Sequence, residues 1–404
     1  MLNLKYFKYF MIAFIFGTLI VWNLQAAAPI TAETQPVTTT SLSIDWAKTY
    51  GQKADDYAIC IVPVGNDSFV LGGGTKTSVS HLDNFWVKKI DRNGDTIWTK
   101  SKNSSILDYV KAIIQTPDGG FVLSGFNKPY GQDGPDNAAF VKLDKDGNIV
   151  WNVTTLKQVD EAPNAIIKNS QGQFFYIGHL FLKNSSHFIA YMGLIDQNGD
   201  TLWRKSFVNN YTTDAQSVIE VKDGGYVITG YKDVSGNGNF DAWVAKVDKG
   251  GNLLWEKTYG GVMEDSGHKV IETPDNHYII LGETDSQGSG GSDVWIFEID
   301  SAGKVIWEKT YGGKEDDKGF SLIRTYDGGY LIGATTKSYG SGSLDAWLIK
   351  IDSDGNYQWS TTIGGPKEDA LNSVIETNPN EYIMVGMTNS YGSGGYDAWV
   401  VKLG

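Results

Sequence analysis

Tryptophan recurs along this chain at a nearly constant interval, and no other feature restricts the possible folds so strongly. The first series is spaced by 52 residues, with a single interval of 53, and consists of Trp46, Trp98, Trp151, Trp203, Trp255, Trp307 and Trp359. A second series, with Ala139 and Tyr191 in two of its places, consists of Trp86, Trp243, Trp295, Trp347 and Trp399. Periods of about 20–50 residues indicate solenoids, propellers or similar arrays. The chain therefore contains a sevenfold repeat.

Each repeat unit has the pattern of four short strands. In residues 255–306, four apolar runs are separated by turn residues, among them PDN at 274–276 and a Gly/Ser loop at 286–291. Asp-Gly pairs such as that in DKDGN (144–148) are typical of tight β-hairpins. Four strands in about 50 residues match the blade of a propeller.

The repeat count also predicts how the structure closes. The last unit supplies only three strand patterns, at 371–376, 382–388 and 397–403, whereas residues 43–50 form one strand pattern without a unit. We therefore predict an all-β fold, a seven-bladed β-propeller with four-stranded blades, in which the N-terminal strand completes the last blade. Such closure removes the long free edges of an open repeat.

The N-terminus predicts export. Lys5 and Lys8 precede an uncharged apolar stretch at 9–24, and small residues follow at 26–28. This pattern indicates a signal peptide at 1–28, or an uncleaved N-terminal anchor because Pro29 follows directly. Residues 29–42 are Thr- and Pro-rich and predict a flexible spacer, and the propeller occupies 43–404. We expect a secreted or cell-surface protein, with membrane contact only through a retained N-terminal segment.

Composition excludes several classes of function. The net charge is −13 without basic blocks, which argues against nucleic-acid binding. Cys60 is the single cysteine, so no intramolecular disulfide can form. The five histidines lack the spacing of a zinc site, and no GxSxG elbow or P-loop occurs. No catalytic residue is predicted, and any metal ligand is unknown from the sequence.

One acid in each unit stands at the start of the predicted innermost strand. Six of these acids lie ten residues after the outer tryptophan, and Asp214 lies eleven residues after it. The seven acids are Asp56, Asp108, Glu161, Asp214, Asp265, Asp317 and Asp369. We expect these residues to form a ring near the channel mouth. Such a ring could bind Ca²⁺ or attract a basic partner. Apart from this ion, no cofactor is predicted. Alternatively, each acid accepts backbone N–H bonds and fixes the turn between blades.

A second acidic set stands two residues before the inner tryptophans: Asp241, Asp293, Asp345 and Asp397, with Asn84 and Asn137 in equivalent places. Since Gly/Ser loops precede them, we interpret these residues as caps of strand starts. The departures from the repeat lie elsewhere. Residues 152–202 concentrate aromatic residues, and 127–137 form an unusual loop, which indicates either a partner site on blades one to three or sequence drift. Five glycosylation sequons lie between residues 66 and 212, at Asn66, Asn103, Asn152, Asn184 and Asn210.

The run DAWVAKVDKGGNLLWEKTYGG (241–261) resembles the seven-bladed β-propeller repeats of secreted bacterial and archaeal proteins, and the resemblance covers 43–404. The segment KVDKGGNLLW (246–255) is also similar to the Asp-Gly-Trp segment of quinoprotein dehydrogenase propellers. Those enzymes usually have eight blades and a cofactor site with an adjacent-cysteine disulfide, whereas this chain has seven units and one cysteine. The related cofactor-free scaffolds fit better.

From these patterns we expect an exported, non-enzymatic propeller that binds an extracellular protein or glycan or serves as a scaffold. The absence of a catalytic motif is the main reason for this expectation. The alternatives are an extracytoplasmic enzyme, either quinoprotein-like or acting on polysaccharides through paired acids, and a structural surface-layer component.

Overall fold

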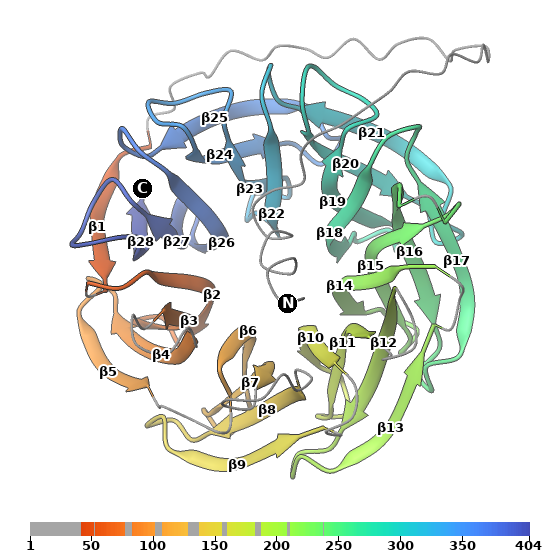
Figure 1. Ribbon diagram of the computed structural model, residues 1–404, viewed down its shortest axis with the longest axis horizontal. Helices are drawn as coiled ribbons and strands as arrows, with labels where there is room; N and C mark the ends of the chain where they lie inside the picture. The colour runs from red at the N-terminus through yellow and green to blue at the C-terminus, as the bar shows by residue number, and fades with distance from the viewer. Residues whose placement is uncertain are drawn as a thin grey trace, which may run out of the picture. The chain divides into compact units, whose positions relative to one another are not determined.

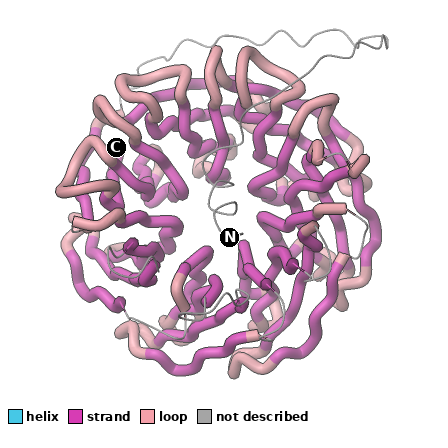
Figure 2. Tube along the Cα trace, in the orientation of Figure 1, coloured by secondary structure: helices cyan, strands magenta, loops and turns pink. Residues whose placement is uncertain are grey.

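The computed structural model describes residues 42–404 apart from 52, 77–82, 102–106, 128–136, 156–159, 182–186, 208–210 and 237. The predicted signal peptide and residues 29–41 of the predicted spacer lie outside the described residues. The described part consists of strands and loops (Figure 2), and none of it is a helix able to span a membrane. Its strands form seven four-stranded antiparallel sheets around one central axis (Figure 1), as the sequence predicts.

Equivalent strands occupy equivalent places in the ring. The innermost strands are β2 (Asp56–Val64), β6 (Tyr109–Gln115), β10 (Asp160–Lys168), β14 (Thr213–Glu220), β18 (Asp265–Glu272), β22 (Asp317–Arg324) and β26 (Asp369–Asn378). The second strands are β3 (Ser68–Lys76), β7 (Phe121–Asn127), β11 (Phe174–Phe181), β15 (Tyr226–Asp233), β19 (Tyr278–Thr284), β23 (Tyr330–Thr336) and β27 (Glu381–Thr388).

The third strands are β4 (Asp83–Asp91), β8 (Asn137–Leu143), β12 (Phe188–Ile195), β16 (Phe240–Val247), β20 (Asp293–Ile299), β24 (Asp345–Ile351) and β28 (Asp397–Leu403). The outermost strands are β5 (Thr96–Ser101), β9 (Ile149–Thr154), β13 (Thr201–Ser206), β17 (Leu253–Tyr259), β21 (Val305–Tyr311), β25 (Tyr357–Ile363) and β1 (Ile44–Tyr50). Blade 1 is β2–β5, the next blades follow in chain order, and blade 7 joins β26–β28 to β1.

The ring closes as predicted, because the first strand pairs antiparallel with the last. Thr49 lies opposite Trp399 and Lys48 opposite Val400. The amide of Ser43 also donates to the carbonyl of Gly404 at 2.9 Å. Opening the ring would break a ladder between the two ends of the chain, so closure makes the blades mutually dependent.

The hydrophobic core is divided among the junctions between neighbouring blades. Each of the seven buried clusters combines side chains from two adjacent blades, as where Phe175 of blade 3 stacks on Tyr226 of blade 4. The outer tryptophans seal the rim. A Cβ added to Gly355 would lie 2.8 Å from the Trp307 ring, so the ring rests on the hairpin turn of the next blade. That turn is built around Gly355, whose φ of 78° favours glycine.

Every innermost strand carries a β-bulge at the same level. In each blade, the pairing between the first and second strands shifts register at one equivalent residue. That residue lies three places after the predicted acid, or three places after Thr213 in blade 4. These residues, here called the axial ring, are Ile59, Lys111, Asn164, Gln216, His268, Phe320 and Asn372. All seven are half-buried, whereas the residue before each is buried. A bulge redirects the side chain of its extra residue, and in three blades that side chain contacts a carbonyl of the next blade.

Candidate functional site

The predicted ring acids begin the innermost strands, but they do not line an open mouth. Between 0% and 8% of the surface of each is exposed in Asp56, Asp108, Glu161, Asp214, Asp265, Asp317 and Asp369. They are distributed over the blade junctions, and the described residues contain no group of three or more acids, histidines or cysteines able to hold a metal ion. Burial follows from topology, because the acid position faces the preceding blade.

The acids of blades 5, 6 and 7 each bind two loops, the one that leads into their own blade and the one between its second and third strands. Asp317 accepts hydrogen bonds at 2.7 Å from the amide of Gly313 and at 2.7 Å from the hydroxyl of Ser338. Asp265 and Asp369 make the corresponding contacts with a glycine amide and a serine hydroxyl. These contacts agree with the alternative that each acid accepts backbone N–H bonds and fixes the turn between blades.

The second acidic set caps the Gly/Ser loops and also meets the first set across the junction. Asp293 accepts a bond from the amide of Ser289 at 2.6 Å, and Asp397 accepts one from Ser393 at 2.8 Å. A Cβ on Gly312 would stand 1.6 Å from Oδ1 of Asp293 and 2.9 Å from Oδ2 of Asp317. The two carboxylates thus face each other with only a glycine between them.

The same arrangement of two aspartates and a glycine recurs at four junctions. Its members are Asp241, Gly260 and Asp265; Asp293, Gly312 and Asp317; Asp345, Gly364 and Asp369; and Asp397, Gly51 and Asp56. Burial raises the pKa of Asp293 to about 7, and the nearby Asp317 and Asp285 add to the rise. Burial and the facing acid also raise the pKa values of Asp241, Asp345 and Asp397. One member of each pair is therefore inclined to hold a proton.

The remaining three junctions lack this pairing. Asn84 and Asn137 replace the first acid at two of them, and Ile189 and Thr213 replace both residues at the junction of blades 3 and 4. Asp214 does not share the position of the other ring acids, because Thr213 occupies it. Since side chains alternate along a strand, Asp214 lies on the opposite face of β14.

Asp214 is instead the centre of a polar cluster between blades 3 and 4. Its carboxylate accepts bonds from the amide nitrogens of Asn164 and Gln216, both at 2.8 Å, and from the Tyr231 hydroxyl at 3.1 Å. His179 Nδ1 lies 3.1 Å away. Burial lowers the pKa of Lys111, in blade 2, to about 8, and the charge of Asp214 opposes that change. Sequence reasoning missed this cluster, because its members come from four strands.

Aromatic rings border the same side of the propeller. Tyr57 and Tyr109 lie with centroids 5.5 Å apart, and Tyr109 stacks on Phe126 at 5.1 Å. In blade 3, the rings of His179 and Phe188 are 4.7 Å apart. All five side chains are half-buried and come from blades 1–3, where the sequence departs from the repeat.

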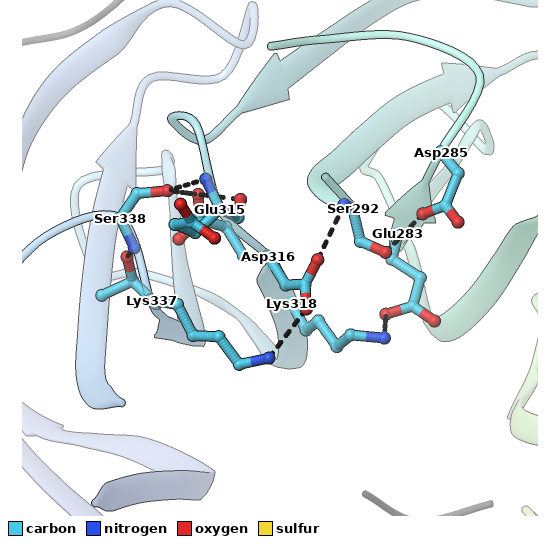
Figure 3. Close-up of polar contacts among 10 residues, drawn as sticks. Glu283, Asp285, Ser292, Glu315, Asp316, Lys318, Lys337 and Ser338 are labelled. Carbon is cyan, nitrogen blue, oxygen red and sulfur yellow. Dashed lines mark hydrogen bonds and ion pairs between the residues drawn. The ribbon is translucent and has the colours of Figure 1, made fainter. Parts of the chain in front are cut away.

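Blades 5 and 6 carry charged groups at the corresponding place, and these pair with one another (Figure 3). Lys318 lies 2.9 Å from Glu283, and Lys337 lies 2.8 Å from Asp316. The Ser292 hydroxyl donates to Asp285. Both lysines of this network are engaged by acids, so neither is free to meet an anionic ligand.

The remaining predicted positions are structurally ordinary. Cys60 faces Gly72 with its sulfur 3.8 Å from the carbonyl, and burial raises the pKa of its thiol to about 12. As the single cysteine, it cannot form the adjacent-cysteine disulfide that the quinoprotein resemblance implies. Among the sequons, Asn66 is exposed in a turn and Asn152 is exposed on β9. Asn103, Asn184 and Asn210 lie outside the described residues.

Comparison with known proteins places the chain among propellers. Residues 83–261 match the family described as outer membrane protein assembly factor BamB. A curated relative, the regulatory protein FlaEY of Caulobacter vibrioides, is 24% identical over 182 residues, which represent 37% of this chain and 19% of FlaEY. The alignment thus spans about a fifth of the length of that relative.

Three solved structures share the fold at low identity. A Dyadobacter fermentans protein of unknown function has a TM-score of 0.54 at 11% identity, covering 90% of this chain and 99% of its own. Puromycin hydrolase has a TM-score of 0.53 at 12% identity, covering 85% of this chain and 51% of its own. Drosophila Semaphorin 1b, extracellular domains 1–2, has a TM-score of 0.52 at 9% identity, covering 89% and 86%. These similarities establish the architecture.

Proposed function

We propose that this seven-bladed β-propeller, of which residues 83–261 resemble the family described as outer membrane protein assembly factor BamB, acts as a binding or scaffold module without catalytic chemistry of its own. Its partner is a protein or a glycan outside the cell or on the cell surface. The proposal includes export, for which the N-terminal sequence pattern is the support.

The observation that carries the proposal is the contrast between the two sides of the propeller near the start of the innermost strands. Blades 5 and 6 present charges that are paired within the protein, whereas blades 1–3 present half-buried aromatic rings centred on Tyr109. Aromatic side chains offer a large contact area with a polar edge, and they dominate recognition surfaces. A partner is therefore expected over blades 1–3.

Two features support binding rather than catalysis. The names of two similar proteins, an assembly factor and a regulatory protein, agree with a non-catalytic role. The single cysteine does not fit the disulfide of a quinone cofactor site, so no catalytic step is derived through such a group. Ca²⁺ is the candidate ion of the same proposal, held by a strand-start acid together with backbone and water oxygens, because the described residues contain no group of three or more acids.

The test is capture of a partner by the full chain, using cell-surface extract and a glycan panel, with two matched tyrosine variants. Tyr109→Ala removes the central ring and is expected to weaken capture roughly tenfold or more, as for an aromatic anchor. Tyr326→Ala, at a side chain that is 67% exposed in blade 6, should leave capture unchanged. Turnover of a substrate without any captured ligand would refute the proposal. Thermal unfolding with Ca²⁺ against a chelator tests the ion, because binding raises the midpoint.

A further inference from the structure

A groove of about 350 Å³ lies on the outer circumference of the propeller, between the end of β13 in blade 3 and the start of β17 in blade 4. These two outermost strands follow one another around the ring (Figure 1). Apolar side chains in the lining include Phe207, which follows β13, Met192 of β12 and Leu253 of β17. The hairpin turn before β17 adds Gly251. A groove of this size, with mixed apolar and polar walls, has the character of a small-ligand site.

At three other junctions, the chain itself supplies a phenol at the equivalent place. Tyr50, Tyr259 and Tyr311 each stand four residues after an outer tryptophan, at the end of an outermost strand. The hydroxyl of each donates to the carbonyl of a hairpin glycine in the next blade, at 2.5, 2.7 and 3.0 Å respectively. Burial raises the pKa values of Tyr50 and Tyr259, so both hydroxyls keep the proton that they donate. The accepting glycines are Gly94, Gly303 and Gly355.

The junction between blades 3 and 4 lacks this phenol. Phe207 stands four residues after Trp203, so it takes the place of the three tyrosines, and its ring has no hydroxyl. Gly251, which is buried and has a φ of 74°, is the hairpin glycine here. None of the described residues donates a hydrogen bond to its carbonyl, and Lys205 donates instead to the side chain of Asn252 at 2.6 Å. Since buried carbonyls are normally paired, this carbonyl is an acceptor that a ligand can use.

The ring of Phe207 also leaves space beside the turn. Tyr259 packs against Phe297 of the next blade, with centroids 5.1 Å apart. In blade 4 the residue at the position of Phe297, two places after the inner tryptophan, is Ala245. Phe207 instead meets Trp243 edge-on, with centroids 4.8 Å apart and an interplanar angle of 83°. The groove therefore lies where the junction of blades 4 and 5 holds the ring of Tyr259.

The charged side chains of the groove are engaged with one another. Lys232 Nζ lies 2.9 Å from Oε1 of Glu256, and Oε2 of Glu256 accepts a bond from Trp243 Nε1 at 2.7 Å. A neutral ligand can therefore enter without displacing this ion pair. An aromatic ring with one hydroxyl matches the apolar wall and the carbonyl together, because it combines a large apolar face with a single donor.

We propose that this groove binds a phenol, whose ring lies against Phe207, Met192 and Leu253 and whose hydroxyl donates to the carbonyl of Gly251. The ligand reproduces from outside the chain the contact that Tyr259 makes within it. The phenol belongs either to a tyrosine of a partner protein or to a free small molecule, since both carry the same chemistry. This inference goes beyond the proposed function, which concerns the aromatic rings of blades 1–3.

The experiment titrates the full chain with p-cresol and follows binding by ligand-observed NMR. The matched ligand 4-fluorotoluene keeps the ring and replaces the hydroxyl with fluorine. It is expected to bind about fivefold more weakly, because it cannot donate to a carbonyl. A Gly-Tyr-Gly tripeptide with blocked ends distinguishes the two sources. Binding of the tripeptide at least as tight as that of p-cresol indicates a tyrosine of a partner protein, whereas binding of p-cresol alone indicates a free phenol.

Three variants locate the site. Phe207→Tyr restores the residue of the other three junctions, so its own hydroxyl should occupy the Gly251 carbonyl and weaken p-cresol binding about tenfold or more. Leu253→Ala removes one apolar wall of the groove and should weaken binding about threefold. Leu202→Ala is the matched control and should leave binding unchanged, because Leu202 is 47% exposed, Leu253 is 49% exposed and only Leu253 lines the groove.

No binding of either p-cresol or the tripeptide, equal affinity for 4-fluorotoluene, or wild-type binding by Phe207→Tyr would each overturn the inference. Equal losses in Leu253→Ala and Leu202→Ala would do the same. Tyr109→Ala is expected to reduce capture of a partner and to leave p-cresol binding unchanged. Capture without phenol binding would therefore reject this inference alone, and phenol binding without a captured partner would reject the proposed function alone.

Discussion

The junctions from blade 4 around to blade 1 contain two facing aspartates each, whereas the junctions from blade 1 to blade 4 contain at most one acid. Asn137 stands where Asp293 stands in the regular junctions, and Ile189 and Thr213 replace both acids at once. In each irregular junction, a residue that cannot ionise occupies the first place. The amide of Asn137 is neutral at every pH, as Asp293 is when protonated. The comparison indicates that a second negative charge is disfavoured at these junctions.

Filling the space between two facing acids should have the largest effect. Gly312→Val places a side chain at a point 1.6 Å from Asp293 and 2.9 Å from Asp317, both of which are anchored by loop amides. We expect a loss of about 3 kcal/mol in the free energy of unfolding, measured by urea titration.

Gly250→Ala is the matched control for that variant. Its nearest neighbour would be Oδ1 of Asp248 at 3.3 Å, and it lies in a hairpin turn outside the junctions. Equal destabilisation by both changes would show that the glycine between the acids has no special role.

The pH dependence of stability should reveal the shared proton. Because the pKa of Asp293 rises from its usual 3.8 to about 7 on folding, the folded state binds this proton more tightly. The resulting stabilisation is complete below pH 3.8 and is lost as the pH rises to 7. The urea midpoint should therefore increase between pH 8 and pH 6. Asp118 and Asp327 have pKa values lowered to about 2 by contacts that include their lysine partners. Their contribution to stability is therefore lost only as the pH falls below the usual pKa of an aspartate, outside the range from pH 8 to pH 6.

The variant Asp293→Asn tests the contribution of this one junction to the pH dependence of stability. The amide removes the second charge, so the variant should gain about 2 kcal/mol at pH 8 and little at pH 5, with a flatter pH profile. Asp300→Asn, in an exposed turn whose backbone amides lower the pKa of the carboxylate, is the control and should not gain stability. Unchanged stability of Asp293→Asn across this range would contradict the assignment of the proton.

The reverse substitution should have the smallest effect. Asn137→Asp introduces the second acid opposite Glu161, at a side chain that is 5% exposed. Glu161 already pairs with Arg204, so part of the new repulsion is offset. We expect a loss of about 1 kcal/mol at pH 8 that disappears at acid pH, measured by the same titration. A pH-independent loss would indicate altered packing rather than charge.

Much of the architecture follows directly from the sequence. Trp46 predicts an outermost strand and its pairing with the last blade, and DKDGN at 144–148 predicts the hairpin that Gly147 makes with a φ of 80°. These features depend on residues close together in the chain or on a repeat period, so local pattern is sufficient. The strand-start position of Asp317 was predicted for the same reason.

The direction of that side chain was not predictable. Asp317 was expected near the channel mouth, yet it is buried against Asp293 of the preceding blade. Lys111 and His268 gave no sequence signal, because a bulge depends on how two strands align. Their position three residues after the acid is regular, but a regular spacing of unlike residues does not form a motif.

The sequence by itself determined the number of blades, the place of each strand and the closure of the ring, since repeat period and turn chemistry act locally. Only the tertiary structure decided which side chains face one another. Asp293 meets Asp317 because two neighbouring blades converge there. Burial then sets the cost of their charges, and burial is a property of the assembled ring rather than of any segment.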